Sequence, residues 1–152
     1  MKIAEIKQLA DLKNLLGEEI AVSDWVTVTQ ERINKFAEAT GDFQWIHVDV
    51  ERAQASPLKS TIAHGYLTLS LIARFSAECV HMPSVKMSLN YGTNKVRFTS
   101  PVPAGSRVRG RFTLKELQDL PGGMQVTMLA TVEIEGFDKP ACVAEVISRR
   151  YE

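Results

Sequence analysis

Residues 64–80, HGYLTLSLIARFSAECV, restrict the fold more than any other stretch, because only Arg74 and Glu78 among them are charged. We expect one long helix here. A helix that is apolar nearly all round has to be buried on most of its sides. The rest of the chain must therefore supply a layer that surrounds it.

The chain before this helix is predicted to be mainly helical. Gly17 is well placed to end a first helix, whose apolar positions are Ile6, Leu9, Leu12, Leu15 and Leu16. Residues 20–28 are rich in β-branched side chains and predict a strand. Thr29 is expected to cap a further helix that ends at Gly41. The apolar positions of that helix are Ile33, Phe36 and Ala37.

After Pro83 the pattern changes to strands. Segments at about 85–100, 106–118, 124–136 and 140–151 are strand-like, and several alternate with the two-residue period of a half-buried strand. The sequences Pro121-Gly122-Gly123 and Gly136 to Pro140 are typical of reversals. Strands joined in this way predict an antiparallel sheet, which must curl around the buried helix. We therefore predict an α+β fold with one long central helix.

Length and charge limit the class of protein. With 152 residues and 45% apolar composition, we expect a single domain over residues 1–152. Eighteen basic and eighteen acidic side chains cancel, so no strong field favours nucleic acid or a membrane surface as partner. No apolar run approaches the ~20 residues of a membrane span, and a soluble, cytoplasmic protein is expected. Cys79 and Cys142 have apolar neighbours and are expected to be reduced packing thiols.

Residues 40–48, TGDFQWIHV, place a carboxylate and an imidazole five residues apart where regular structure is not expected. At neutral pH, Asp42 and His47 supply a carboxylate and a largely neutral imidazole, and both can accept hydrogen bonds from one water. Gly41 allows the sharp turn that lets them converge. A partly apolar wall is expected from Phe43, Trp45 and Ile46. Taken alone, such a pair is more often a turn former and a surface group than a catalyst.

Three segments in this order resemble the MaoC-like dehydratases: GDFQWIH, then IAHGYLTLSL at 62–71, then VRFTSPVPAGSRV at 96–108. These are hot-dog-fold proteins that include the R-specific enoyl-CoA hydratases, and the similarity is closest to their short, NodN-like branch. The resemblance covers most of the chain, from about residue 20 onward. It implies a long helix wrapped by a strongly bent antiparallel sheet, in agreement with the element order above. It also implies a homodimer whose two sheets join, with sites at the subunit interface.

The resemblance implies catalytic roles for three residues. Asp42 and His47 are implied to bind the catalytic water. Gly65, at the start of the central helix, is implied as the backbone donor to the enolate oxygen, where the positive helix end is favourable.

Two further residues are predicted to bind substrate. Gln44, with Trp45, stands where the family commonly has Asn-Pro, so the shape of the pocket does not carry over. Gln44 is expected either to orient the loop or the water, or to act as a structural cap. His64 is either a contact of the site or a helix-capping or structural histidine.

The basic side chains concentrate in one region: Lys95, Arg97, Arg107, Arg109 and Arg111. Alternation along a strand puts the last three on one face. That face is either a solvated sheet surface or a landing place for the phosphates of coenzyme A, because arginine pairs well with phosphate. Asn94 and Arg97 are the preferred substrate-binding candidates, because they lie in a stretch that resembles the family.

The predicted function is that of a hydro-lyase of fatty acid metabolism, which interconverts a trans-2-enoyl thioester and an (R)-3-hydroxyacyl thioester. Its stereochemistry follows from the resemblance alone. We expect no redox cofactor and, from three histidines without ligand spacing, no metal. The substrate would be carried on coenzyme A or acyl-carrier protein. The alternatives are a hot-dog acyl-CoA thioesterase and a non-catalytic acyl-thioester-binding or scaffolding protein, although a binder has no need for both Asp42 and His47.

Overall fold

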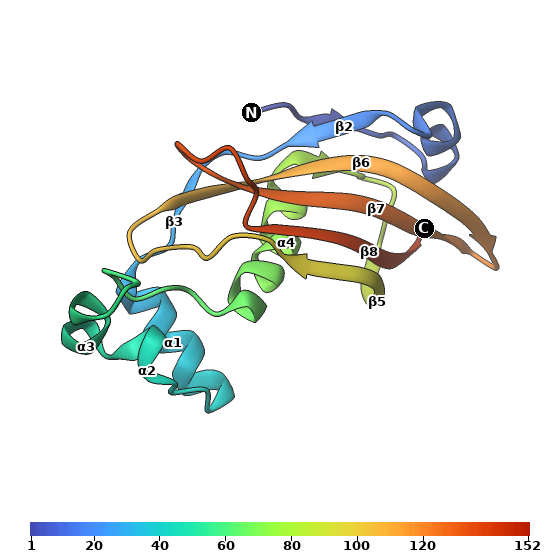
Figure 1. Cartoon of the computed structure of the whole chain (residues 1–152). Coiled ribbons are helices and arrows are strands. Elements are labelled where there is room, and N and C mark those ends of the chain that lie inside the picture. Colours follow the sequence, from blue (N-terminus) through green and yellow to red (C-terminus); the bar gives the residue numbers. More distant parts are fainter.

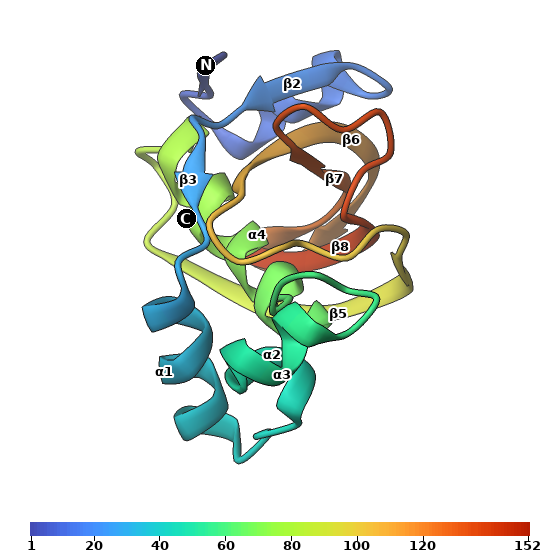
Figure 2. The same ribbon diagram turned by 60° about the vertical axis from the view of Figure 1, so that its left-hand side comes forward.

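The computed structural model describes residues 1–152, and its main feature is a sheet that curves around one long helix (Figure 1, Figure 2). The six-stranded antiparallel sheet has the order β2-β6-β7-β8-β5, with β3 also paired to β6. Its strands are β2 (Glu19–Val22), β3 (Val26–Thr27), β5 (Met87–Phe98), β6 (Arg107–Leu120), β7 (Gly123–Ile134) and β8 (Cys142–Tyr151). The predicted α+β fold and its four late strands are confirmed.

The central helix α4 (Gly65–Cys79) packs one face against the concave side of the sheet. Its buried residues are Leu67, Thr68, Leu71, Ile72, Phe75 and Cys79. The expectation that this helix is buried on most sides is wrong for a single chain. An exposed stripe follows the opposite face: Tyr66, Ser70, Ala73 and Ala77. These residues are spaced by three or four positions, so they share one side of the helix.

A glycine in the sheet lets α4 come close. Phe75 of α4 and Phe112 of β6 are fully buried. A Cβ built on Gly110 would lie 2.8 Å from the Cβ of Phe75, so any other residue would push the helix away from the strand. The core therefore depends on a close approach between helix and sheet at this position.

The N-terminal region differs from the prediction. In place of a helix from Ile6 to Leu16, the chain forms β1 (Ala4–Glu5) and a 3₁₀ helix, η1 (Leu9–Leu15). The strand β1 pairs in parallel with β4 (Val80–His81), directly after α4. The predicted strand at 20–28 is split into β2 and β3, and between them the Ser23 hydroxyl accepts a hydrogen bond from the N–H of Gly110 at 2.9 Å.

A lobe of helices lies beyond the end of the sheet (Figure 1). It contains α1 (Gln30–Thr40), α2 (Trp45–Val48) and α3 (Val50–Ala55). Thr29 accepts a hydrogen bond from the N–H of Arg32 and caps α1 as predicted, and Gly41 ends α1 with φ of 77°. Helices of this protein are all too short or too polar to cross a membrane.

Candidate active site

Asp42 and His47 enter the site from opposite ends of a short segment between α1 and α3. Gly41 turns the chain, so Asp42 follows in an exposed loop, where its carboxylate accepts a hydrogen bond from the N–H of Gln44 at 3.3 Å. His47 is 6% exposed and lies on α2, a single helical turn, although the sequence predicts irregular structure here. The Gln30 amide of α1 donates to the carbonyl of His47 at 2.7 Å and thereby fixes α2 against α1.

The hydrogen bond of His47 decides which ring nitrogen is free. Its Nδ1 lies 2.7 Å from the carbonyl oxygen of Ile62. A carbonyl can only accept, so Nδ1 carries the hydrogen and donates it. The lone pair of the neutral ring is therefore on Nε2, which can accept a proton from a water molecule.

His64 lies against this pair. Its ring stacks on that of His47, with centroids 3.9 Å apart and planes 24° apart. Its Nε2 donates to the backbone carbonyl of Asp42 at 3.0 Å, which joins the Asp42 loop to the start of α4. Its side chain makes no capping hydrogen bond, so the helix-capping interpretation is wrong. The buried Nδ1 of His64 has no hydrogen-bond partner in this chain.

The fold brings together donors that are not spaced as metal ligands along the sequence. Side-chain ligand atoms of Asp42, His47 and His64 all lie within 4.8 Å of one another. The spacing argument against a metal therefore does not hold in three dimensions. The nearly parallel stacking of the two imidazoles is nonetheless unfavourable for coordination, because lone pairs lie in the ring planes and have to converge on one point around an ion.

A cavity of about 360 Å³ adjoins His47 and reaches the beginning of α4. We call it the His47 cavity; among the residues that line it are Ile46, His47, Ile62, Gly65, Thr68 and Phe98. Gly65 is the first residue of α4, so its N–H has no carbonyl to bond within the helix. The cavity thus combines a base, a free backbone donor and the positive end of a 15-residue helix.

The expected apolar wall around the pair forms only in part. Ile46 lines the His47 cavity, but Phe43 is 58% exposed and Trp45 lies under the Arg52 guanidinium, 4.3 Å from it. The Gln44 side chain is exposed and makes no capping hydrogen bond, although Gln44 occupies the N-cap position of α2. In a single chain this wall leaves Asp42 open to solvent.

The row of arginines on β6 is a surface of ion pairs. Arg107 pairs with Glu135 at 2.9 Å, Arg109 with Glu133 at 2.7 Å and Arg111 with Glu19 at 2.9 Å. The hydrogen bonds that Arg111 donates to the Glu19 carboxylate raise the pKa of Arg111. The neutralised row is therefore unsuited to be a landing place for phosphates.

Asn94 and Arg97 lie on β5 outside the His47 cavity. Asn94 donates to Glu145 at 3.3 Å, and Lys115 is the main cause of the lowered pKa of that carboxylate. Arg97 forms no ion pair, and its Nη1 donates to the carbonyl of Val96 at 2.8 Å. Because it precedes Phe98 in the strand, Arg97 lies on the opposite face of the sheet from the cavity.

Sequence reasoning missed two groups that position His47. The carbonyl of Ile62 fixes its ring, and Gln30 holds its backbone. Ile62 lies in the IAHG segment, which had been noted only for its histidine and glycine. Gln30 lies in the first turn of a helix that looks exposed, so nothing in the sequence indicated a role for it. Its side chain also accepts a hydrogen bond from Thr61.

A bent antiparallel sheet around a helix defines a hot-dog-fold protein, and the aspartate and histidine near the helix N-terminus form a candidate acid–base site. Comparison with known families specifies it further. The MaoC like domain matches residues 11–136, and the chain belongs to this family of MaoC-like dehydratases.

Individual relatives agree with this assignment. The chain is 54% identical over 144 residues to 3-hydroxyacyl-thioester dehydratase Z of Mycobacterium tuberculosis, which covers 94% of this chain and 95% of that protein. It is 49% identical over 145 residues to nodulation protein N of Rhizobium leguminosarum bv. viciae. The matched region is 92% of this chain and 89% of that protein. Among solved structures, the unliganded R-hydratase of Pseudomonas aeruginosa is similar with a TM-score of 0.73 and 25% identity, over 90% of this chain and 82% of that one.

Proposed function

We propose that this protein is an R-specific enoyl-thioester hydratase, a hydro-lyase that interconverts trans-2-enoyl and (R)-3-hydroxyacyl thioesters. The observation that carries the proposal is the convergence of Asp42 and His47, together with the free N–H of Gly65 in the cavity that His47 lines. The mycobacterial relative named as a 3-hydroxyacyl-thioester dehydratase, similar over nearly its whole length, supports the same reaction class.

The proposed chemistry uses one water held between the pair. Nε2 of His47 takes one proton from the water, and the carboxylate of Asp42 accepts a hydrogen bond from the other. The oxygen forms a bond to the β carbon as the double bond opens toward the thioester. The imidazolium of His47 then delivers its proton to the α carbon. All atoms of the water are thereby added, and the pair returns to its starting state.

Negative charge develops on the thioester oxygen during addition. We assign its stabilisation to the N–H of Gly65, which has no intrahelical acceptor and lies at the positive end of α4. A preorganised donor of this kind contributes about 10²- to 10³-fold in rate. Because the reaction needs only a base, an acid and this donor, we propose that it requires neither a metal nor a redox cofactor. Activity that persists after dialysis against a chelator would support this.

The decisive experiment follows two signals in parallel. Purified protein receives crotonyl-CoA and a longer enoyl-CoA, and loss of the conjugated-enoyl absorbance is recorded separately from release of free thiol. We expect hydration without thiol release. Thiol release alone would identify a thioesterase, and neither signal at any chain length would identify an acyl-thioester binder.

Substitutions in the pair separate chemistry from folding. His47→Asn retains an amide that can donate to the carbonyl of Ile62 but lacks the accepting nitrogen. Asp42→Asn retains size and removes the charge. Each is expected to reduce turnover by ~10²-fold or more while the unfolding transition is nearly unchanged. Near-normal turnover in both folded variants would exclude the pair.

We further propose that the active form is a homodimer joined through β5. This strand ends the sheet, so its outer edge carries unpaired N–H and C=O groups, and nearly all of its side chains are exposed. Its exposed apolar residues are Met87, Leu89, Tyr91 and Phe98. A second copy at this edge would also reach toward the exposed stripe of α4. Light scattering coupled to size exclusion measures the mass in solution, and a monomer that hydrates crotonyl-CoA would contradict the dimer.

A further inference from the structure

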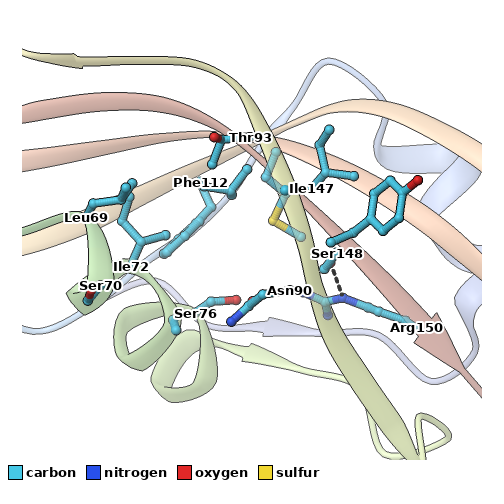
Figure 3. Close-up of a pocket in the computed structure, with 15 residues that line it drawn as sticks. Leu69, Ser70, Ile72, Ser76, Asn90, Thr93, Phe112, Ile147, Ser148 and Arg150 are labelled. Atoms are coloured by element: carbon cyan, nitrogen blue, oxygen red, sulfur yellow. Dashed lines mark hydrogen bonds between the residues drawn. The ribbon is translucent and has the colours of Figure 1, made fainter. Parts of the chain in front are cut away.

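A second cavity, of about 370 Å³, lies between the middle of α4 and the concave face of the sheet (Figure 3). We call it the Arg150 pocket. Its apolar wall includes Leu69, Ile72, Phe112, Met128 and Val146, and its polar lining includes Ser76, Asn90, Ser148 and Arg150. The pocket is separate from the His47 cavity, and neither the catalytic pair nor Gly65 lines it.

Arg150 is buried without a carboxylate. It is 8% exposed and projects from β8 to the inner side of the sheet. Its Nε donates to the hydroxyl of Ser148 at 3.2 Å, and its Nη1 donates to the Met82 sulfur at 2.8 Å. A thioether is a weak acceptor, and no other group of the chain bonds this guanidinium. Burial lowers the pKa of Arg150, and no carboxylate opposes that effect.

A buried charge that lacks a counterion is costly for the fold. The arginines of β6 differ from Arg150, because they lie on the outer face of the sheet and have carboxylate partners. Figure 3 shows the guanidinium of Arg150 extending beneath Ser148 toward Asn90 and Ser76. The unused donors thus face the polar end of an otherwise apolar pocket. Such an arrangement fits a molecule that is apolar along its length and anionic at its end.

We propose that the Arg150 pocket binds the distal carboxylate of an acyl chain, and that the preferred substrates are therefore thioesters of dicarboxylic acids. The inference rests on the proposed hydratase function, because it concerns the far end of the same substrate. The planar guanidinium can hold a carboxylate with two parallel hydrogen bonds. Ser148 and Asn90 offer additional donors beside it.

Both cavities are lined by residues of α4 and of β5. The His47 cavity touches α4 at Gly65 and Thr68, and the Arg150 pocket touches it from Leu69 to Ser76. From Gly65 to Ser76 the helix rises about 16 Å. An extended chain advances roughly 1.2 Å per single bond. An acyl chain of about a dozen carbons that runs along α4 would therefore match the distance from Gly65, in the His47 cavity, to Ser76, in the Arg150 pocket.

The test compares enoyl-CoA substrates of increasing length, in pairs that end either in a methyl group or in a carboxylate. For the wild-type protein, kcat/KM is expected to favour the carboxylate about 10- to 100-fold near the matching length, as a charge-assisted hydrogen-bond pair would. Arg150→Met should abolish this preference and improve the methyl-ended substrate. Normal hydration of methyl-ended chains with no carboxylate preference at any length would overturn the inference and leave the hydratase function intact.

A free dicarboxylic acid of the matching length distinguishes the end of a substrate from a separate ligand. Competitive inhibition that is weakened by Arg150→Met would support the proposal. Calorimetric binding without inhibition would assign the pocket to a separate ligand and overturn it. If no enoyl-CoA is hydrated at all, the proposed function fails, and the same calorimetric titration still shows whether the pocket binds a carboxylate.

Stability measurements separate this role from a structural one. An apolar side chain in place of an uncompensated buried cation is expected to leave the melting temperature unchanged or to raise it. Arg150→Lys retains the positive charge but loses the planar guanidinium, so it should keep part of the preference for carboxylate-ended substrates. A large fall in melting temperature or dissociation of the dimer in both variants would mean that Arg150 serves the fold or the interface, against the proposal.

Discussion

The substitution Gly65→Ala offers a sharp test of where the thioester lies. A Cβ at this position would come within 2.8–2.9 Å of three carbons of the Phe98 ring. Ordinary carbon–carbon contact begins near 3.5 Å, so the ring would have to retreat by roughly 0.7 Å. Phe98 is 44% exposed and can move outward. Because alanine is also favourable in a helix, we expect unfolding free energy to change by no more than about 1 kcal/mol.

Activity should respond much more strongly than stability. Gly65 and Phe98 both line the cavity that contains His47, so a shifted ring changes the position that we propose for the thioester, beside the N–H of residue 65. A displacement approaching 1 Å costs about 10²-fold in rate when it disturbs the reacting geometry. We therefore expect kcat/KM for enoyl-CoA to fall by about that factor in a folded protein.

A double-mutant cycle attributes the loss to the ring. In a Phe98→Ala background the new methyl group has room, so the further effect of Gly65→Ala on kcat/KM should shrink to about twofold. Initial rates of enoyl absorbance loss and urea unfolding curves provide both measurements. Full activity in Gly65→Ala would place the thioester elsewhere, and an equal loss in both backgrounds would refute the role of Phe98.

Three other outcomes follow from the geometry. Burial raises the pKa of Cys79 and of Cys142 to about 11, so neither thiol should react with a disulfide reagent at neutral pH until the protein unfolds. Rapid labelling of the native protein would argue against this burial. Because the thiols ionise at lower pH in the unfolded chain, the free energy of unfolding should decline as pH rises from 9.0 toward 11. Thr29→Ala removes the cap of α1 and should cost about 1 kcal/mol in urea unfolding. Gly123→Ala would put a Cβ 2.2 Å from the Arg150 carbonyl oxygen, and a loss of about 3 kcal/mol in the same assay is expected because backbone cannot yield as a side chain does.

Local sequence signals were enough to predict the helices and strands whose structure depends mainly on their own residues. The cap at Thr29 and the left-handed Gly41 delimit α1, and alternation identified the late strands. The N-terminal region was harder, because β1 exists only through its pairing with β4, some eighty residues later in the chain. Leucines at helical spacing there serve a 3₁₀ turn that packs against the sheet.

The site shows the same division. The motif and its resemblance to a family indicated Asp42 and His47, but the tautomer of His47 depends on Ile62 and could be known only in three dimensions. Arg150 was overlooked although a signal existed. Every second residue from Cys142 onward faces the core, and continuing that count places Arg150 inside.

The order of the sheet has a consequence for synthesis. The only sheet partner of β5 is β8, the last strand of the chain. At usual rates of translation, some seconds separate the appearance of Phe98 from that of Cys142. During this interval the nascent chain carries a long unpaired strand with exposed Met87, Leu89 and Tyr91. Chaperone binding to nascent chains of increasing length should therefore peak after β5 has emerged and fall once β8 is complete.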